Sequence, residues 1–166
     1  MTEPVSDALV AEVWQEMAVM SASQIPGLID QMQDEQPALL AFLLALEGDE
    51  LPQEEFEVIL YLGIAVWQMM KRGHPRLMHV SIKKLEQENE ENIQTLKFME
   101  QDTTSDFLSA TREILDSYPE PAVLGYIVEA LMETNPEDVE LSKATIGIAF
   151  LHLKTMLDAL IRCRPK

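Results

Sequence analysis

The sequence predicts an all-α protein of about eight helices. Apolar residues recur every three or four positions through most of the 166 residues, and the strict alternation of a half-buried strand is nowhere sustained. Prolines and glycines fall between the periodic segments, where they end one helix and begin the next. Hydrophobic residues make up 47% of the chain, so the apolar mass is sufficient for a core. We therefore expect one domain over residues 1–166, built as a compact bundle or a short α-superhelix.

The first three predicted helices follow one another closely, over residues 6–20, 23–35 and 38–46. In the first, Asp7 suits the positive N-terminal end of the helix dipole. Pro26 lies in the first turn of the second helix, which ends before Gln36 because a residue that precedes proline avoids the helical region. The third helix has no polar residue on any face, so we expect it to be buried, and Gly48 is placed to cap it.

The remaining helices are predicted over residues 52–72, 81–100, 105–117, 121–133 and either 136–162 or 142–162. Pro52 begins the longest of them, with acidic residues in its first turns and Lys71 and Arg72 in its last, which matches the dipole at both ends. The helix over 81–100 has a polar middle that contains Asn89 and Asn92. Trp14 and Trp67 fall on apolar faces, so both are predicted to lie in the core.

The two halves of the chain resemble two copies of one unit. At an offset of 84 residues Pro37 aligns with Pro121, Pro52 with Pro136, and the Gly-Ile-Ala triplet that begins at Gly63 with the one at Gly147, without a gap. This register predicts an internal duplication, with units over about residues 5–72 and 89–162 joined by a connection over 71–84. Because glycine is costly inside a helix, we expect both glycines to mark close helix packing.

The charge of the chain excludes several classes of function. Twelve Lys and Arg against 29 Asp and Glu give a net charge of −17, which argues against binding to nucleic acid or to an anionic membrane. No uninterrupted apolar run reaches the length of a membrane span, and the acidic N-terminus does not have the features of a signal peptide. The single cysteine, Cys163, fits a reducing compartment, so a cytoplasmic location is expected.

The acidic residues suggest a surface for a protein partner. Residues 1–70 hold 13 acids and no Lys or Arg. An acidic helical surface can neutralise a basic protein, and we expect the binding residues in the densest acidic stretch, at Asp34, Glu35, Glu54 and Glu55. The alternative interpretation of so acidic a surface is solubility alone.

The connection over residues 71–84 reverses the sign of the charge. It holds five Lys and Arg, two histidines and no acid. One interpretation is an anion or hinge site, carried by Arg72, His74, Arg76 and His79. The other is that Lys71 and Arg72 complement a helix C-terminus and that the remaining cations pair with nearby acids.

Two pairs of carboxylates at a spacing of three residues suggest a metal site. They are Glu88 with Glu91 and Glu113 with Asp116. Residues three apart share one helix face, and carboxylate oxygens suit magnesium. The pattern resembles that of the all-α nucleoside triphosphate pyrophosphohydrolases, in which four carboxylates on two helices hold Mg²⁺, and the resemblance implies a magnesium-dependent enzyme. Equal spacing elsewhere in the chain, as at Glu137 and Glu140, favours a solvated helix face instead.

We therefore expect a non-catalytic interaction or regulatory module that needs no cofactor. The magnesium-dependent enzyme is the first alternative, and a protein that binds a small apolar ligand between its two units is the second. A homodimer is compatible with the sequence. His152, among Phe150, Leu151 and Leu153, is expected to be a partly buried, hydrogen-bonded histidine, and Arg162 and Arg164 are expected to lower the pKa of Cys163.

Overall fold

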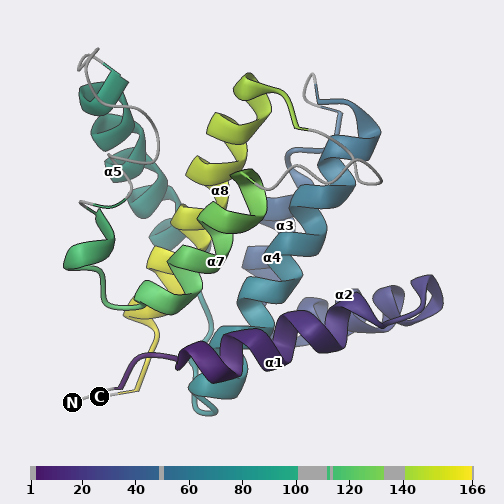
Figure 1. Cartoon of the computed structure of the whole chain (residues 1–166). Coiled ribbons are helices and arrows are strands. Elements are labelled where there is room, and N and C mark those ends of the chain that lie inside the picture. Colours follow the sequence, from purple (N-terminus) through teal and green to yellow (C-terminus); the bar gives the residue numbers. More distant parts are fainter. Residues whose placement is uncertain (1–2, 49–50, 101–111, 113, 133–140, 166) are drawn as a thin grey trace.

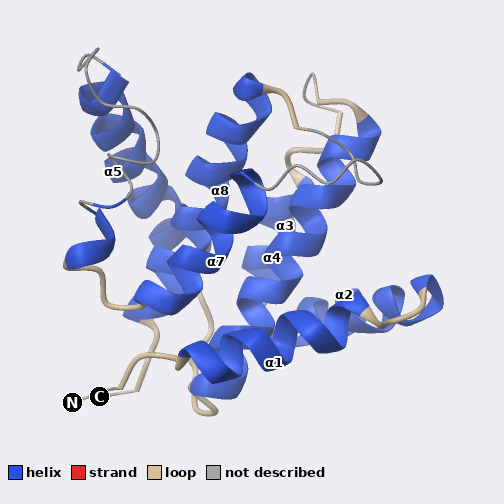
Figure 2. Ribbon diagram, viewed as in Figure 1, coloured by secondary structure: helices blue, strands red, loops and turns tan. Residues whose placement is uncertain are grey.

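The computed structural model confirms the predicted all-α class. It describes residues 3–48, 51–100, 112, 114–132 and 141–165, and within these ranges the regular elements are helices and none is a strand (Figure 2). The elements are α1 (Asp7–Ala18), the 3₁₀ helix η1 (Ala22–Gln24), α2 (Ile25–Glu35), α3 (Pro37–Leu44), α4 (Gln53–Gly73), α5 (Ile82–Glu100), α7 (Pro121–Met132) and α8 (Lys143–Arg162). The helix predicted over 105–117 lies mostly outside the described residues.

Local capping explains where several helices begin and end. The Ser6 hydroxyl accepts a hydrogen bond from the backbone N–H of Leu9 and begins α1, and the Ser142 hydroxyl does the same for α8. As predicted, α2 ends immediately before Gln36. After α3, Gly48 adopts a φ of +81°, which other residues reach only with strain. Turn chemistry therefore places most helix ends within two residues of their predicted positions.

Two long helices, α4 and α8, contact each other at the centre of the molecule. In Figure 1, α1 crosses α4 near one end, α7 lies on α8, and α5 packs along α8. Trp67 on α4 and Phe150 on α8 are fully buried, so the prediction for Trp67 is confirmed. The prediction for Trp14 was wrong, because its side chain is 44% exposed on α1. A helix packed on one side leaves a wide outer face, and Trp14 lies at the edge of that face.

The helix expected to be wholly buried, α3, is buried on one side only. Leu39, Leu40 and Leu43 contact the core, whereas Ala41 and Leu44 are exposed. An apolar composition all around the helix therefore did not imply burial all around.

One described helix is long and apolar enough to cross a membrane by length and composition. It is α8 over Ala144–Arg162, in which polar residues interrupt the apolar sequence. In the structure 56% of its most apolar window is buried inside the protein. This window therefore contributes to the core around α4.

One hydrogen-bond arrangement, between a side chain that precedes a proline and the backbone N–H of a valine, occurs twice in the described residues. The residue before Pro37, Gln36, accepts a hydrogen bond from the backbone N–H of Val80 through its side-chain oxygen (2.9 Å). The residue before Pro121, Glu120, accepts one from Val5 in the same way (2.7 Å). Each valine is buried and precedes the serine that begins α5 or α1. Gln36 and Glu120 are 84 residues apart and the two valines are 75 residues apart, so the arrangement does not keep one offset, and the duplication stays a prediction.

The expectation that both equivalent glycines mark close packing was wrong for one of them. A Cβ on Gly63 would lie 2.6 Å from Cδ1 of the buried Leu43, so α3 and α4 approach closely there. A Cβ on Gly147 would meet nothing within 4 Å. Gly147 lies in the first turns of α8 and is exposed among the residues that the structure describes.

Alanine substitutions at the two glycines should therefore change stability in opposite directions. Gly147→Ala should stabilise the protein by about 0.5–1 kcal/mol, because alanine favours the helix and meets no neighbour. Gly63→Ala should destabilise it by about 1–2 kcal/mol, because Leu43 has no room to move in the packed core. Urea unfolding of both variants measures the difference, and equal shifts of the same sign would contradict the packing described at Gly63.

Candidate functional site

The four acids predicted to bind a partner lie at two ends of the molecule. Asp34 and Glu35 end α2, and the Glu35 carboxylate pairs with Lys71 in the last turn of α4 (2.7 Å). Glu54 and Glu55 lie in the first turn of the same helix. The rise of 1.5 Å per residue separates the two sites by roughly 24 Å, so the four residues do not form one small surface.

Glu55 is not presented to solvent as we expected. Its side chain is buried, and its carboxylate accepts a hydrogen bond from the backbone N–H of Ser142 (2.9 Å), which begins α8. A negative charge at this position suits the N-terminal end of α8. Glu55 therefore joins the two long helices, and a partner could not reach it without disturbing the fold.

Two exposed acids, one on α1 and one on α2, pair with cations in the last turn of α4. Glu16 on α1 pairs with Arg72, and Glu35 on α2 pairs with its neighbour Lys71, so the two helices approach the same end of α4. The guanidinium of Arg72 holds the pKa of Glu16 below its usual value. We call the exposed acids of these two helices, apart from Asp7 at the start of α1, the α1–α2 acidic surface. Its members are Glu12, Glu16, Asp30, Asp34 and Glu35.

The four residues of the predicted anion or hinge site do not converge. Arg72 is paired with Glu16, and His74 is buried. Arg76 and His79 are exposed. The helix-capping interpretation therefore fits Lys71 and Arg72, which pair with acids at the end of α4, but it does not account for the exposed cations that follow.

His74 belongs to a buried cluster around one carboxylate. Glu120, which is fully buried, accepts hydrogen bonds from the Nε2–H of His74 (2.6 Å), from Nη1 of Arg164 (2.9 Å) and from the backbone N–H of Val5 (2.7 Å). The donors come from the two ends of the chain and from the segment after α4, and both ends meet in Figure 1. This cluster could not be predicted from sequence spacing, because its members are at least 44 residues apart.

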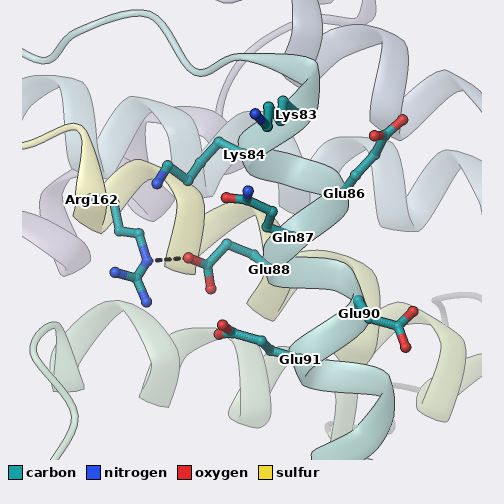
Figure 3. Close-up of a pocket in the computed structure, with 8 residues that line it drawn as sticks. All are labelled: Lys83, Lys84, Glu86, Gln87, Glu88, Glu90, Glu91 and Arg162. Atoms are coloured by element: carbon teal, nitrogen blue, oxygen red, sulfur yellow. Dashed lines mark hydrogen bonds and ion pairs between the residues drawn. The ribbon is translucent and has the colours of Figure 1, made fainter.

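A charged cleft of about 720 Å³ lies beside α5, at the end of α8 (Figure 3). The Glu88 carboxylate, which is buried, pairs with Arg162 of α8. Figure 3 shows the side chains of Lys84, Glu88 and Arg162 on one side of α5. The side chains of Glu86 and Glu90 point to the other side of the helix. The residues that line the cleft are Lys83, Lys84, Glu86, Gln87, Glu88, Glu90, Glu91 and Arg162.

The cleft contains two of the four carboxylates of the predicted magnesium site. Glu88 is already neutralised by Arg162, and Glu91 and Asp116 are exposed. Glu113 lies outside the described residues. Within the described part of the chain no three acidic, histidine or cysteine side chains come together as metal ligands. The magnesium hypothesis thus has no assembled donor set in this region, and an arginine on Glu88 opposes a cation there.

The polar middle of α5 packs against α8 through a hydrogen-bond network. The amide of Asn92 donates to Thr155 Oγ1 (3.1 Å) and to Asp158 Oδ2 (2.9 Å), and its oxygen accepts from Lys154 Nζ (2.7 Å). The Tyr118 hydroxyl donates to the other oxygen of Asp158. Burial, reinforced by the Asp158 carboxylate, raises the pKa of Tyr118, which therefore stays protonated as the donor.

Two further titratable residues, His152 and Cys163, lie on α8 and directly after it. His152 is confirmed as a partly buried, hydrogen-bonded histidine: its Nε2–H donates to the carbonyl of Phe42 (2.6 Å), its ring stacks on the Phe42 ring, and burial lowers its pKa. The expectation for Cys163 was wrong. Burial raises the pKa of its thiol, and this effect outweighs the opposing charge of Lys84.

Comparison with known proteins adds no assignment to this geometry. No family model matches the chain, and neither a curated protein nor a solved structure matches it.

Proposed function

We propose that the protein is a non-catalytic interaction module whose α1–α2 acidic surface binds a basic protein partner. The observation that supports this proposal is the composition of the surface. Its five carboxylates are exposed, and neither α1 nor α2 contains a Lys or Arg that could neutralise them. Only two of the five, Glu16 and Glu35, take part in ion pairs with described residues. Glu12, Asp30 and Asp34 therefore remain available to cations of another molecule.

The exposed apolar residues on the same part of the chain support a protein as the ligand. Trp14 is 44% exposed on α1, and Val19 at the end of that helix is exposed as well. Tryptophan is enriched among residues that dominate binding energy at interfaces. Carboxylates steer a basic partner and fix its orientation, while the burial of an indole contributes affinity that salt does not screen. Solubility alone would require the charges but not the indole.

The experiment that tests this proposal is a comparative pull-down with three forms of the full chain. The surface variant is Glu12→Gln, Asp30→Asn, Asp34→Asn, which removes three exposed charges that form no ion pair with described residues. The control variant is Glu54→Gln, Glu86→Gln, Glu129→Gln, which removes three exposed charges elsewhere. Both variants change the net charge equally, so any difference between them reports position and not total charge.

We expect the wild type and the control to retain the same basic proteins from a lysate at low salt. The surface variant should retain at least about tenfold less of them, since three charge contacts of up to 1 kcal/mol each are lost. High salt should release part of the bound material from the wild type. Equal retention by both variants would refute the placement of the partner on α1 and α2.

A further inference from the structure

The connection between the two units presents an unusual combination of exposed apolar and cationic side chains. Met78 is 65% exposed and Ile82 is 63% exposed. Arg76, His79 and Lys83 are exposed in the same segment, and Lys84 is partly exposed. We call these six residues the basic–apolar surface. Single exposed apolar residues are ordinary, but two such residues among four cationic or titratable side chains on a protein of charge −17 require an explanation.

The backbone that carries these residues is held in place. The Gln36 side chain donates to the carbonyl of Met78 (3.0 Å) and accepts from the N–H of Val80 (2.9 Å). The N–H of Met78 donates to the carbonyl of Cys163 beyond α8 (3.0 Å). The fold thus fixes the backbone of this segment through groups that do not depend on which side chains stand at positions 78 and 82. Polar side chains there would be compatible with the same fold.

The lysines and the arginine of this surface have no acidic partner among the described residues. Lys71 and Arg72, at the start of the connection, are paired with Glu35 and Glu16. Arg76, Lys83 and Lys84 form no ion pair with any residue in the part of the chain that the structure describes. Arg162, from the other end of the sequence, is 54% exposed and lines the same cleft as Lys83 and Lys84. Two distant basic segments are therefore brought together.

We propose that the basic–apolar surface binds an acidic segment of a partner protein that carries apolar side chains between its carboxylates. Carboxylates of such a segment would pair with Arg76, Lys83 and Lys84, and its apolar side chains would cover Met78 and Ile82. This surface shares no residue with the α1–α2 acidic surface and takes a partner of the opposite charge.

The surroundings of the surface favour a short segment over an extended polyanion. Glu86, Glu90 and Glu91 follow Lys84 on exposed positions of α5, and all three line the adjoining cleft. A duplex or an anionic bilayer would extend over these carboxylates and be repelled by them. At physiological ionic strength charges are screened within about 8 Å, so a short acidic segment interacts mainly with the local cations despite the net charge of the whole protein.

The test measures binding of a fluorescein-labelled peptide of alternating glutamate with leucine or phenylalanine to the full chain, by fluorescence anisotropy. Three variants are compared with the wild type. Lys83→Gln, Lys84→Gln removes two cations, and Met78→Ser, Ile82→Ser removes the apolar side chains. Gln15→Glu, Gln31→Glu is the matched control, because it makes the same change in net charge at exposed positions on α1 and α2.

We expect the lysine variant and the apolar variant each to weaken binding by about tenfold, and the control to bind as the wild type does. All four proteins should unfold at the same urea concentration, since the altered side chains are exposed. A peptide with serine in place of the apolar residues should bind more weakly than the original. The proposal is overturned if either variant binds like the wild type, if no binding occurs, or if phosphatidylserine vesicles or duplex DNA bind more tightly than the peptide.

Discussion

Replacement of Glu120 by alanine should destabilise the protein by about 3–5 kcal/mol, the loss typical when one partner of a buried ion pair is removed. The Glu120 carboxylate is fully buried and accepts three hydrogen bonds, from His74, Arg164 and the backbone of Val5. Without it, the side chain of His74 and the N–H of Val5 remain buried with no acceptor in the position that Glu120 occupies. Since small domains are stable by only about 5–15 kcal/mol, this is a large part of the total.

Urea unfolding followed by circular dichroism measures this effect. Glu120→Gln retains an oxygen that can accept from Val5, so its loss should be smaller, about 1–3 kcal/mol. Glu129→Ala serves as the control, because Glu129 is the next acid after Glu120 in the sequence and is exposed on α7. It should change stability by less than about 0.5 kcal/mol. A loss for Glu120→Ala no larger than that of the control would show that the cluster does not hold the chain ends together.

Replacement of Asn92 by alanine should cost about 2–3 kcal/mol and act mainly on α5. Among the described side chains of α5 the buried ones are Leu85, Glu88 and Asn92, and two of these three contact α8 through polar groups. Loss of the Asn92 amide removes three hydrogen bonds, to Thr155, Asp158 and Lys154. Buried polar groups that lose a partner cost about 1–3 kcal/mol each, although Lys154 and Asp158 still pair with each other.

Hydrogen exchange distinguishes a local effect from a global one. In Asn92→Ala the amides of α5 should exchange faster than in the wild type, while those of α4 keep most of their protection. Gln94→Ala is the matched control, since Gln94 is exposed and bonds only to Glu90 on its own helix. If the amides of α5 exchange at the wild-type rate in Asn92→Ala, the hydrogen bonds of Asn92 do not hold α5 to α8.

The helices could be predicted from the sequence because local signals determine them. Ser6 and Pro37 act on neighbouring backbone groups, so their effects can be read without knowledge of the fold. The contacts between helices could not be predicted in the same way. Gly63 and Gly147 each begin a Gly-Ile-Ala triplet, yet among the described residues a Cβ would meet a neighbouring helix at Gly63 and not at Gly147. The side of a helix that is covered depends on where its neighbours pack.

The same limit explains the outcome at the charged residues. Glu54 and Glu55 are adjacent and identical in type, but one is exposed and the other accepts a hydrogen bond from Ser142, 87 residues away. Lys71 and Lys84 belong to one basic connection, and only Lys71 is paired with an acid among the described residues. Charge density along the sequence indicated that surfaces of both signs exist. Which side chains remain available on them follows from tertiary contacts.

The central claim, that a basic partner binds at α1 and α2, is tested most directly by zero-length carbodiimide crosslinking of the full chain with its captured partner. This reagent joins a carboxylate to a lysine amine only when the two are in contact. The account predicts crosslinks from partner lysines to Glu12, Asp30 or Asp34. Crosslinks confined to Glu54 and Glu57 of α4, or to the acids of α5, would contradict it.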